Sequence, residues 1–178
     1  MYAFFAQVPQ VVEQLDFSKL RTAGSGGASL PEELLHKTNE SFGVSISEGY
    51  GLTESTVMLM TTHRSLPKKV NSVGMPLPGI DLKLVDPEGN EVVNHEVGEI
   101  LFRGPNMMKG YYKKPDETAN AIKDGWLYTG DLAYRDEEGY HFIVDRKKDI
   151  IIRGGFNIYP RELEELLYQH PAIVECSV

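Results

Sequence analysis

Asp131 and Arg146 are the two side chains whose types and spacing best suit the binding of a small hydroxylated ligand. They begin and end the stretch DLAYRDEEGYHFIVDR, in which apolar residues alternate on both sides of the turn residues 136–139. This pattern predicts a β-hairpin, whose two ends are neighbours in space. A carboxylate offers two acceptor oxygens and a guanidinium five fixed donors, which together suit a vicinal diol such as a ribose. An ion pair at the end of a sheet is the alternative, and the pattern alone favours it.

The residues after Arg146 predict an exposed connection between two sheet segments. Lys147-Lys148-Asp149 is charged, and the apolar runs on both sides of it, Ile150–Ile152 among them, suit packed surfaces. We interpret this tripeptide as a candidate hinge. Gly154-Gly155 then permits either a bulge or the close approach of a narrow ligand to the backbone.

Four strings of the sequence form a set: EGYGLTE at 48–54, YTGDL at 128–132, DRKKD at 145–149 and GGFNIYPRE at 154–162. Together they resemble the adenylate-forming superfamily, and most closely its acyl-CoA synthetase branch, which includes fatty-acyl-CoA and 4-coumarate-CoA ligases. The strings occur in the family order with comparable spacing, and the resemblance covers nearly the whole chain.

The resemblance implies a binding site for ATP or AMP. Adenine is expected against the backbone at Gly27 and Ala28 and against the ring of Tyr50, because an aromatic face suits a purine. Gly49 and Gly51 are expected to give that ring room. By residue type alone, the glycines also suit an ordinary turn, and Tyr50 an ordinary core position.

The resemblance also implies roles beside the phosphates and the ribose. Thr53 and Glu54 are the expected catalytic residues, with Thr53 at the α-phosphate and Glu54 binding Mg²⁺, since hard cations take carboxylate oxygens. Asp131 and Arg146 are expected at the ribose hydroxyls. Threonine and glutamate are also common near helix starts, so a loop cap is the alternative at 53–54.

Further residues are implied for the second half-reaction. In the resembled family a small C-terminal domain rotates between adenylation and thioester formation, and Lys148 matches the pivot. Gly154, Gly155 and Phe156 are expected at the CoA site.

The implied function is that of an acyl-CoA ligase of fatty acid metabolism. Such an enzyme activates a carboxylic acid with ATP and Mg²⁺ to an acyl-adenylate and then transfers the acyl group to CoA. An adenylation domain that loads a carrier-protein thiol is the sibling alternative, although the stretch 154–160 favours CoA. A non-catalytic nucleotide-binding module is the third. Five glycines beside the expected acyl pocket favour a medium-to-long or aromatic acid over acetate: Gly24, Gly26, Gly27, Gly49 and Gly51.

Two parts of the family pattern are missing from this sequence, namely the Ser/Thr/Gly-rich phosphate loop and the late lysine of the small domain. We therefore expect the sequence to be an excerpt of a longer protein. Because both parts act on the phosphates of ATP, we expect the 178 residues alone to be catalytically inactive.

The composition, 41% hydrophobic and 25% charged, is typical of a soluble globular protein of about one domain. A net charge of −8 argues against a nucleic-acid-binding surface. The single Cys176 excludes an intramolecular disulfide. The first ten residues lack the basic start of a signal peptide, and no apolar run reaches the ~18 residues of a membrane span. We expect a cytoplasmic protein with small-molecule partners.

Residues 1–70 predict an α/β unit, which the resemblance assigns to the large AMP-binding domain. A helical pattern over 2–15 is interrupted at Pro9, and a strand at 20–28 runs into a glycine turn. A helix with a capping box at 29–32 and a stop at Gly43 then precedes a strand at 44–47.

Residues 71–145 predict an antiparallel β unit, which suits the barrel-like subdomain of the family. Its strands are expected at 80–86, 91–96 and 98–104 and in the hairpin, with a short helix at 115–123. Asn71 stands where the family often has glycine.

Residues 146–149 are the expected hinge, and residues 150–178 the start of the small α+β C-terminal domain. Pro160 is expected to open a helix that Pro171 stops, and a strand is expected from residue 172 onward.

Overall fold

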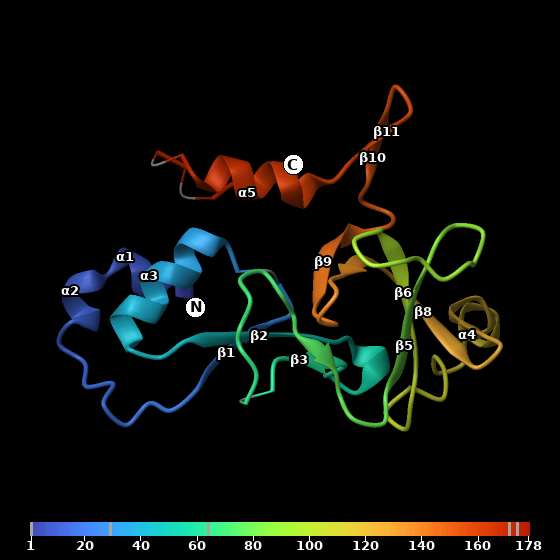
Figure 1. Cartoon of the computed structure of the whole chain (residues 1–178), viewed down its shortest axis with the longest axis horizontal. Helices are drawn as coiled ribbons and strands as arrows, with labels where there is room; N and C mark the ends of the chain where they lie inside the picture. Colours follow the sequence, from blue (N-terminus) through green and yellow to red (C-terminus); the bar gives the residue numbers. More distant parts are fainter. Residues whose placement is uncertain (1, 29, 64, 171, 174) are drawn as a thin grey trace.

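The structure is a computed structural model that describes residues 2–28, 30–63, 65–170, 172–173 and 175–178. Its elements form three groups (Figure 1): three helices on a first sheet, a second sheet beside them, and a last helix with a small hairpin above both. Within the described ranges, none of the helices combines the length and the apolar character that a membrane crossing requires.

The first group is an α/β unit whose sheet extends past residue 70, the expected boundary. Its helices are α1 (Tyr2–Gln7), α2 (Pro9–Val12) and α3 (Glu32–Phe42), and its strands are β1 (Ala23–Gly26), β2 (Ile46–Tyr50), β3 (Met60–Thr61) and β4 (Met75–Pro76). Strands β1 and β2 are parallel, and β3 and β4 continue the sheet antiparallel. The helices bury an apolar cluster that includes Leu35, Phe42 and Ile46.

Two details of this unit were predicted from sequence. The N-terminal helix is interrupted before Pro9, and α3 ends at Gly43, which caps it in the left-handed conformation at φ 66°. The expected capping residue, Ser29, lies outside the described residues; Pro31 precedes the first helical residue.

The second group is the predicted antiparallel sheet. Its strands are β5 (Asp81–Val85), β6 (Gly98–Arg103), β7 (Ile122–Lys123), β8 (Trp126–Arg135) and β9 (His141–Arg146), and helix α4 (Pro115–Ala121) precedes β7. One edge of the long strand β8 pairs with β6, and the other pairs first with β7 and then with β9. The core beneath it includes Ile100, Phe102, Leu127 and Ala133.

Two predicted strands are wrong. In the segment 91–96 only Glu91 pairs, through an isolated bridge to Val85, because a turn from Val93 to Glu96 with His95 at φ 68° bends the chain out of the sheet. The described residues of 172–178 contain no strand either. They lie along the last helix, where the Val178 amide donates to the Glu164 carboxylate.

The predicted helix at 115–123 ends at Ala121, and its last two residues form β7. Asn71 has φ 62°, a left-handed conformation that asparagine tolerates better than other non-glycine residues. This explains how it stands where relatives of the resembled family often have glycine.

The third group follows the candidate hinge. Strands β10 (Ile151–Arg153) and β11 (Phe156–Ile158) form a hairpin, and helix α5 (Pro160–Tyr168) follows. Gly154 and Gly155 connect the strands with φ 61° and 84°, the conformation that a two-residue hairpin turn of type I′ requires. The hairpin turn is enough to explain this glycine pair. Neither the bulge nor the close ligand that the sequence left open is needed.

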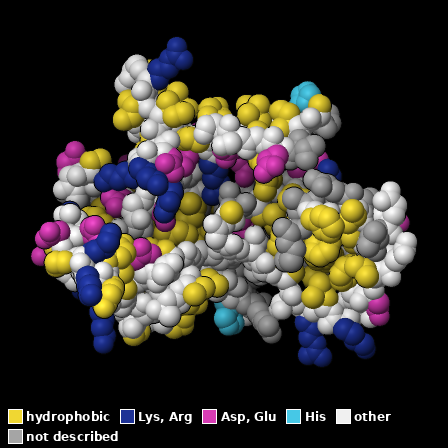
Figure 2. Space-filling model, turned by 180° about the vertical axis from the view of Figure 1, so that it is seen from behind, with side chains coloured by type: hydrophobic (Ala, Val, Ile, Leu, Met, Phe, Trp, Pro, Cys, Tyr) yellow, Lys and Arg dark blue, Asp and Glu magenta, His cyan; other side chains and the backbone are white. Residues whose placement is uncertain are grey.

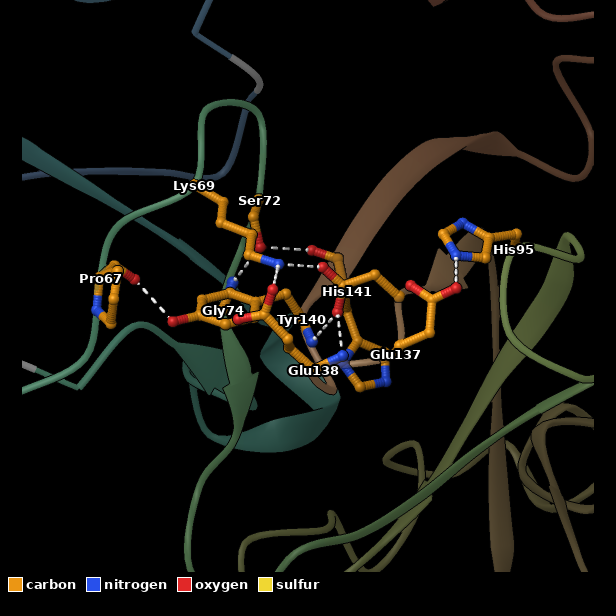
Figure 3. A network of polar contacts seen from close by, with 10 residues as sticks. Pro67, Lys69, Ser72, Gly74, His95, Glu137, Glu138, Tyr140 and His141 are labelled. Atoms are coloured by element: carbon orange, nitrogen blue, oxygen red, sulfur yellow. Dashed lines mark hydrogen bonds and ion pairs between the residues drawn. The ribbon is translucent and has the colours of Figure 1, made fainter.

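A polar network joins the two sheets at the turn of the β8–β9 hairpin (Figure 3). The Lys69 ammonium contacts Asp136 at 2.5 Å and Glu138 at 2.8 Å, and it lies over the Tyr140 ring. Ser72 and Val73 donate to the backbone carbonyl of His141, whose amide donates to Gly74. These contacts fix the hairpin that carries Asp131 and Arg146.

The His141 ring is 2% exposed, and neither ring nitrogen has a hydrogen-bond partner among the described residues. Burial lowers its pKa to about 4, so the folded state binds this proton less readily than the unfolded chain, where histidine titrates near 6.5. The stability that depends on neutral His141 is therefore complete above pH 6.5 and is lost as the pH falls toward 4, by about 3 kcal/mol at pH 4.

We expect His141→Phe to remove this part of the acid sensitivity. Urea unfolding at a series of pH values measures it, as the free energy of unfolding of both proteins. Equal dependence of that free energy on pH in both proteins would contradict the assignment.

Candidate functional site

The predicted pair lies where the hairpin pattern placed it. Asp131 on β8 is directly opposite Arg146 on β9, and the Arg146 Nε donates to the Asp131 Oδ1 at 3.1 Å. Asp131 is buried, whereas more than half of the Arg146 side chain is exposed. The carboxylate raises the pKa of Arg146 above its ordinary value, which keeps the guanidinium charged.

Tyr50 adds a third member from another sheet. Its hydroxyl, at the end of β2, donates to the Asp131 Oδ2 at 2.5 Å. Burial, and then the neighbouring carboxylate, raise the pKa of Tyr50 far above its ordinary value, so that it stays a donor. The ring packs against the core of the second sheet. Tyr50 thus has the core position that its residue type suggested and also contacts the candidate site.

The glycines on both sides of Tyr50 lie where the chain approaches itself closely. A Cβ on Gly51 would lie 1.7 Å from the Val57 carbonyl oxygen, and a Cβ on Gly49 would lie 3.0 Å from the Met58 sulfur. This close approach favours glycine at both positions, whatever room the Tyr50 ring needs. The two glycines let the chain return closely along β2 as it enters β3.

A cavity of about 720 Å³ opens beside this cluster. Seven of the predicted nucleotide-binding residues line it: Gly27, Ala28, Gly49, Tyr50, Gly51, Asp131 and Arg146. The five from the first sheet meet because β1 and β2 are parallel, so that the carboxyl ends of both strands reach the same edge of the sheet. The hydrogen bond from Tyr50 to Asp131 joins them to the β8–β9 pair. Helix α5 closes the opposite side with Pro160, Arg161 and Glu164.

Buried Glu48 also lines this cavity, and burial raises its pKa. Figure 2 shows acidic and basic side chains along the seam between the third group and the sheets below it. The cavity is thus lined by charged side chains together with glycine backbone.

Thr53 and Glu54 lie in the 3₁₀ helix η1 (Thr53–Ser55), outside the residues that line the cavity. Thr53 is exposed, and Glu54 is half-buried, with its Oε1 accepting a hydrogen bond from the Tyr111 hydroxyl at 2.8 Å. The described part of the chain holds no group of three or more His, Cys, Asp or Glu side chains suited to a metal ion. Glu54 therefore offers one carboxylate.

The remaining predicted residues do not join the cavity. Gly154, Gly155 and Phe156 are exposed at the end of the β10–β11 hairpin, and none of them lines it. Lys148 is exposed in a turn that the Asp149 amide closes by donating to the Arg146 carbonyl.

Sequence reasoning missed two residues that hold this arrangement. Glu99 on β6 accepts from the Gly130 amide at 3.1 Å and from the Lys147 ammonium at 2.8 Å. A charge inside the otherwise apolar run GEILF was the signal for it.

The second missed residue is Arg161 on α5. It donates from Nη1 to the Ile143 carbonyl at 2.6 Å and from its amide to the Asp145 carboxylate. Nothing in its local pattern distinguishes this arginine from an exposed one.

The sequence model of AMP-binding enzymes matches residues 1–112, which contain the cavity's glycine walls and Tyr50. The chain belongs to the AMP-binding enzyme family. The resemblance to the acyl-CoA synthetase branch of the adenylate-forming superfamily is confirmed by similar proteins.

This AMP-binding enzyme chain is 46% identical over 168 residues to the long-chain-fatty-acid–CoA ligase of Bacillus subtilis (strain 168), a match that covers 94% of this chain and 30% of that protein. Its fold is similar to that of an anthranilate CoA ligase in complex with anthranoyl-AMP, with a TM-score of 0.91 and 33% identity over 99% of this chain and 34% of the other. The o-succinylbenzoate coenzyme A synthetase of Bacillus subtilis, in complex with ATP and a magnesium ion, gives a TM-score of 0.83 and 34% identity over 97% of this chain and 37% of the other. The chain thus spans 30–37% of the lengths of these three proteins.

Proposed function

We propose that the protein carrying this chain is an ATP-dependent acyl-CoA ligase that forms AMP. The observation that carries the proposal is the cluster of Tyr50, Asp131 and Arg146 beside a cavity walled by glycine backbone. The solved relatives support it, since one holds anthranoyl-AMP and another holds ATP with magnesium.

The cluster suits the sugar of a nucleotide. Asp131 presents a buried carboxylate that is fixed by donors on both oxygens, and the exposed Arg146 guanidinium has four N–H groups besides the one on Nε that contacts Asp131. In the proposed complex these two side chains hold the ribose hydroxyls. Adenine lies against the Gly27-Ala28 backbone and the face of Tyr50.

The proposed reaction has two steps at this cavity. In the first, a carboxylate oxygen of the acid attacks the α-phosphorus of ATP, the bond from that phosphorus to the bridging oxygen breaks, and pyrophosphate leaves. In the second, the CoA sulfur attacks the acyl carbon, and AMP leaves with the electron pair of the broken C–O bond. The chain's residues contribute mainly by positioning ATP and excluding water, with Thr53 beside the α-phosphate.

Glu54 fits a magnesium ion by the chemistry of its donor, because Mg²⁺ in nucleotide sites takes one or two carboxylates together with phosphate oxygens. When bound, the ion would neutralise charge on the phosphates. Glu54 would hold it, and the turn that carries Glu54 would keep the carboxylate in place.

We further propose that Gly154, Gly155 and Phe156 approach CoA only after the third group rotates about Lys148. Their position supports this, since all three are exposed in the hairpin that follows Lys148 and none of them lines the cavity in the present pose. We also propose the domain boundaries expected from the sequence. The α/β unit spans 1–70, the antiparallel β unit 71–145, the hinge 146–149 and the start of the small C-terminal domain 150–178.

The proposed acyl substrate is a medium-to-long or aromatic carboxylic acid, consistent with the long-chain ligase and the anthranilate ligase among the relatives. One part of the glycine-rich wall is less open than expected, because the Met58 thioether lies against Gly49; methionine is flexible and adapts to bulky ligands.

We expect the full-length enzyme to show kcat/KM at least about a hundredfold higher for octanoate, palmitate or a cinnamate than for acetate, since each buried methylene contributes tenfold or more. Acid-dependent ATP–pyrophosphate exchange and CoA thioester formation are the assays. If kcat/KM is highest for acetate, the proposal of a medium-to-long or aromatic acid is wrong. Exchange without a CoA thioester would instead point to a carrier-protein thiol, and no exchange with any acid would reject the ligase.

A further inference from the structure

The turn that carries Glu54 is hydrogen-bonded to a segment far away in sequence, residues 104–112, which follows β6. Asn106 donates from its side chain to the carbonyls of Ser55 at 2.8 Å and Met58 at 3.1 Å, and its own carbonyl accepts from the Thr56 hydroxyl. The Met108 amide donates to the Glu54 carbonyl at 2.8 Å. The backbone of the turn is thus fixed from outside by several hydrogen bonds.

The backbone just after Glu54 is in an unfavourable conformation. Thr56 and Val57 have φ 52° and 85°, a left-handed region that β-branched residues rarely adopt. Such strain persists only where the surrounding contacts impose it, and it occurs often at functional sites. Asn106 and Met108 supply those contacts.

The same segment also fixes the Glu54 side chain. The Tyr111 hydroxyl donates to the Glu54 Oε1 at 2.8 Å. Tyr111 is itself held, since its amide donates to the Thr118 hydroxyl in α4 at 2.9 Å. A chain of contacts therefore leads from α4 through Tyr111 to one oxygen of the carboxylate.

We propose that Tyr111 is a positioning residue for Glu54, holding its carboxylate in the orientation that receives the divalent cation. This inference rests on the proposed function, in which Glu54 binds Mg²⁺. A carboxylate that is already held loses less side-chain freedom when the cation binds. Tyr111 therefore acts on metal affinity without touching the metal or the substrate.

The test compares Tyr111→Phe with Tyr112→Phe in the full-length enzyme. The first change removes only the hydroxyl that Glu54 accepts, whereas Tyr112 is 85% exposed and contacts the Lys113 ammonium through its ring face. We expect Tyr111→Phe to raise the Mg²⁺ concentration for half-maximal rate roughly two- to tenfold, the effect of losing one net hydrogen bond. Saturating Mg²⁺ should restore kcat, and Tyr112→Phe should behave as wild type.

A second readout is independent of turnover. Mn²⁺ binding in the presence of a non-hydrolysable ATP analogue, followed by electron paramagnetic resonance, should weaken by the same factor in Tyr111→Phe. In a double-mutant cycle the Tyr111→Phe effect should disappear in the Glu54→Gln background, because the hydroxyl acts through that carboxylate.

The outcomes separate this inference from the proposed function. Unchanged Mg²⁺ and Mn²⁺ dependence in Tyr111→Phe, an equal shift in Tyr112→Phe, or a shift that persists beside Glu54→Gln would each overturn the role of Tyr111 while the ligase activity stands. If Glu54→Gln alone leaves Mn²⁺ affinity unchanged, Glu54 is instead rejected as the metal-binding carboxylate.

Discussion

Replacing Asp131 by alanine in the full-length enzyme is expected to weaken ATP binding about ten- to a hundredfold. The substitution removes a buried carboxylate that accepts from both Tyr50 and Arg146 and that, in the proposed complex, also accepts from a ribose hydroxyl. Losing one buried charge-assisted hydrogen bond costs on the order of 1.5–3 kcal/mol, which corresponds to that factor. Isothermal calorimetry with ATP measures it, and a thermal melt checks that the variant folds.

The chain offers a matched control for this substitution. Asp81 and Arg103 form the same kind of pair, directly opposite each other on β5 and β6 with 2.8 Å between Nε and Oδ2, but they lie outside the cavity. Asp81→Ala should leave ATP affinity unchanged. If Asp131→Ala also leaves it unchanged, Asp131 and Arg146 are only an ion pair at the end of a sheet, which is the alternative that the sequence pattern favoured.

Lys148→Pro is expected to separate the two half-reactions, with the rate of one falling at least about tenfold more than that of the other. In the present pose Arg161 fixes α5 to β9 through the Ile143 carbonyl and the Asp145 carboxylate, contacts that a rotation about residue 148 has to break. Proline fixes φ near −65° at 148 and restricts the preceding residue, so that one pose is disfavoured more than the other. Pyrophosphate exchange and thioester formation from a supplied acyl-adenylate measure the two steps separately.

Lys148→Ala is the control for the hinge, since it removes the same ammonium and leaves the backbone free. If the backbone at residue 148 is what matters, Lys148→Ala should not reproduce the unequal loss of the two half-reactions. Equal losses of both half-reactions in Lys148→Pro would argue against a pivot at this position.

Local sequence pattern by itself determined much of this protein. The alternation around residues 136–139 predicted the hairpin, and with it the contact of Asp131 with Arg146, because a hairpin register depends on residues close in sequence. Helix α3 and its Gly43 cap followed from spacing and residue type in the same way. The four motifs identified the family, which its sequence model and its relatives confirm.

The sequence failed where distant contacts compete with local preference. The run 91–96 has a strand pattern, yet only Glu91 pairs, because the chain turns at His95, whose amide donates to the Arg135 carbonyl at the turn end of the β8–β9 hairpin. Local pattern did not predict the close return of the chain at Val57 and Met58, which favours glycine on both sides of Tyr50, whatever room its ring needs.

Only the tertiary structure decided which distant side chains contact one another in and around the candidate site. The Tyr50 hydroxyl meets Asp131, Glu99 holds both Gly130 and Lys147, and Tyr111 reaches Glu54, each across a long stretch of chain. Hydrogen bonds of this kind leave no periodic trace in a sequence, because they depend on how two sheets pack together rather than on the spacing within one strand. The motifs therefore predicted the candidate nucleotide-binding residues, and the contact of Tyr50 with Asp131 between the two sheets brought them to one site.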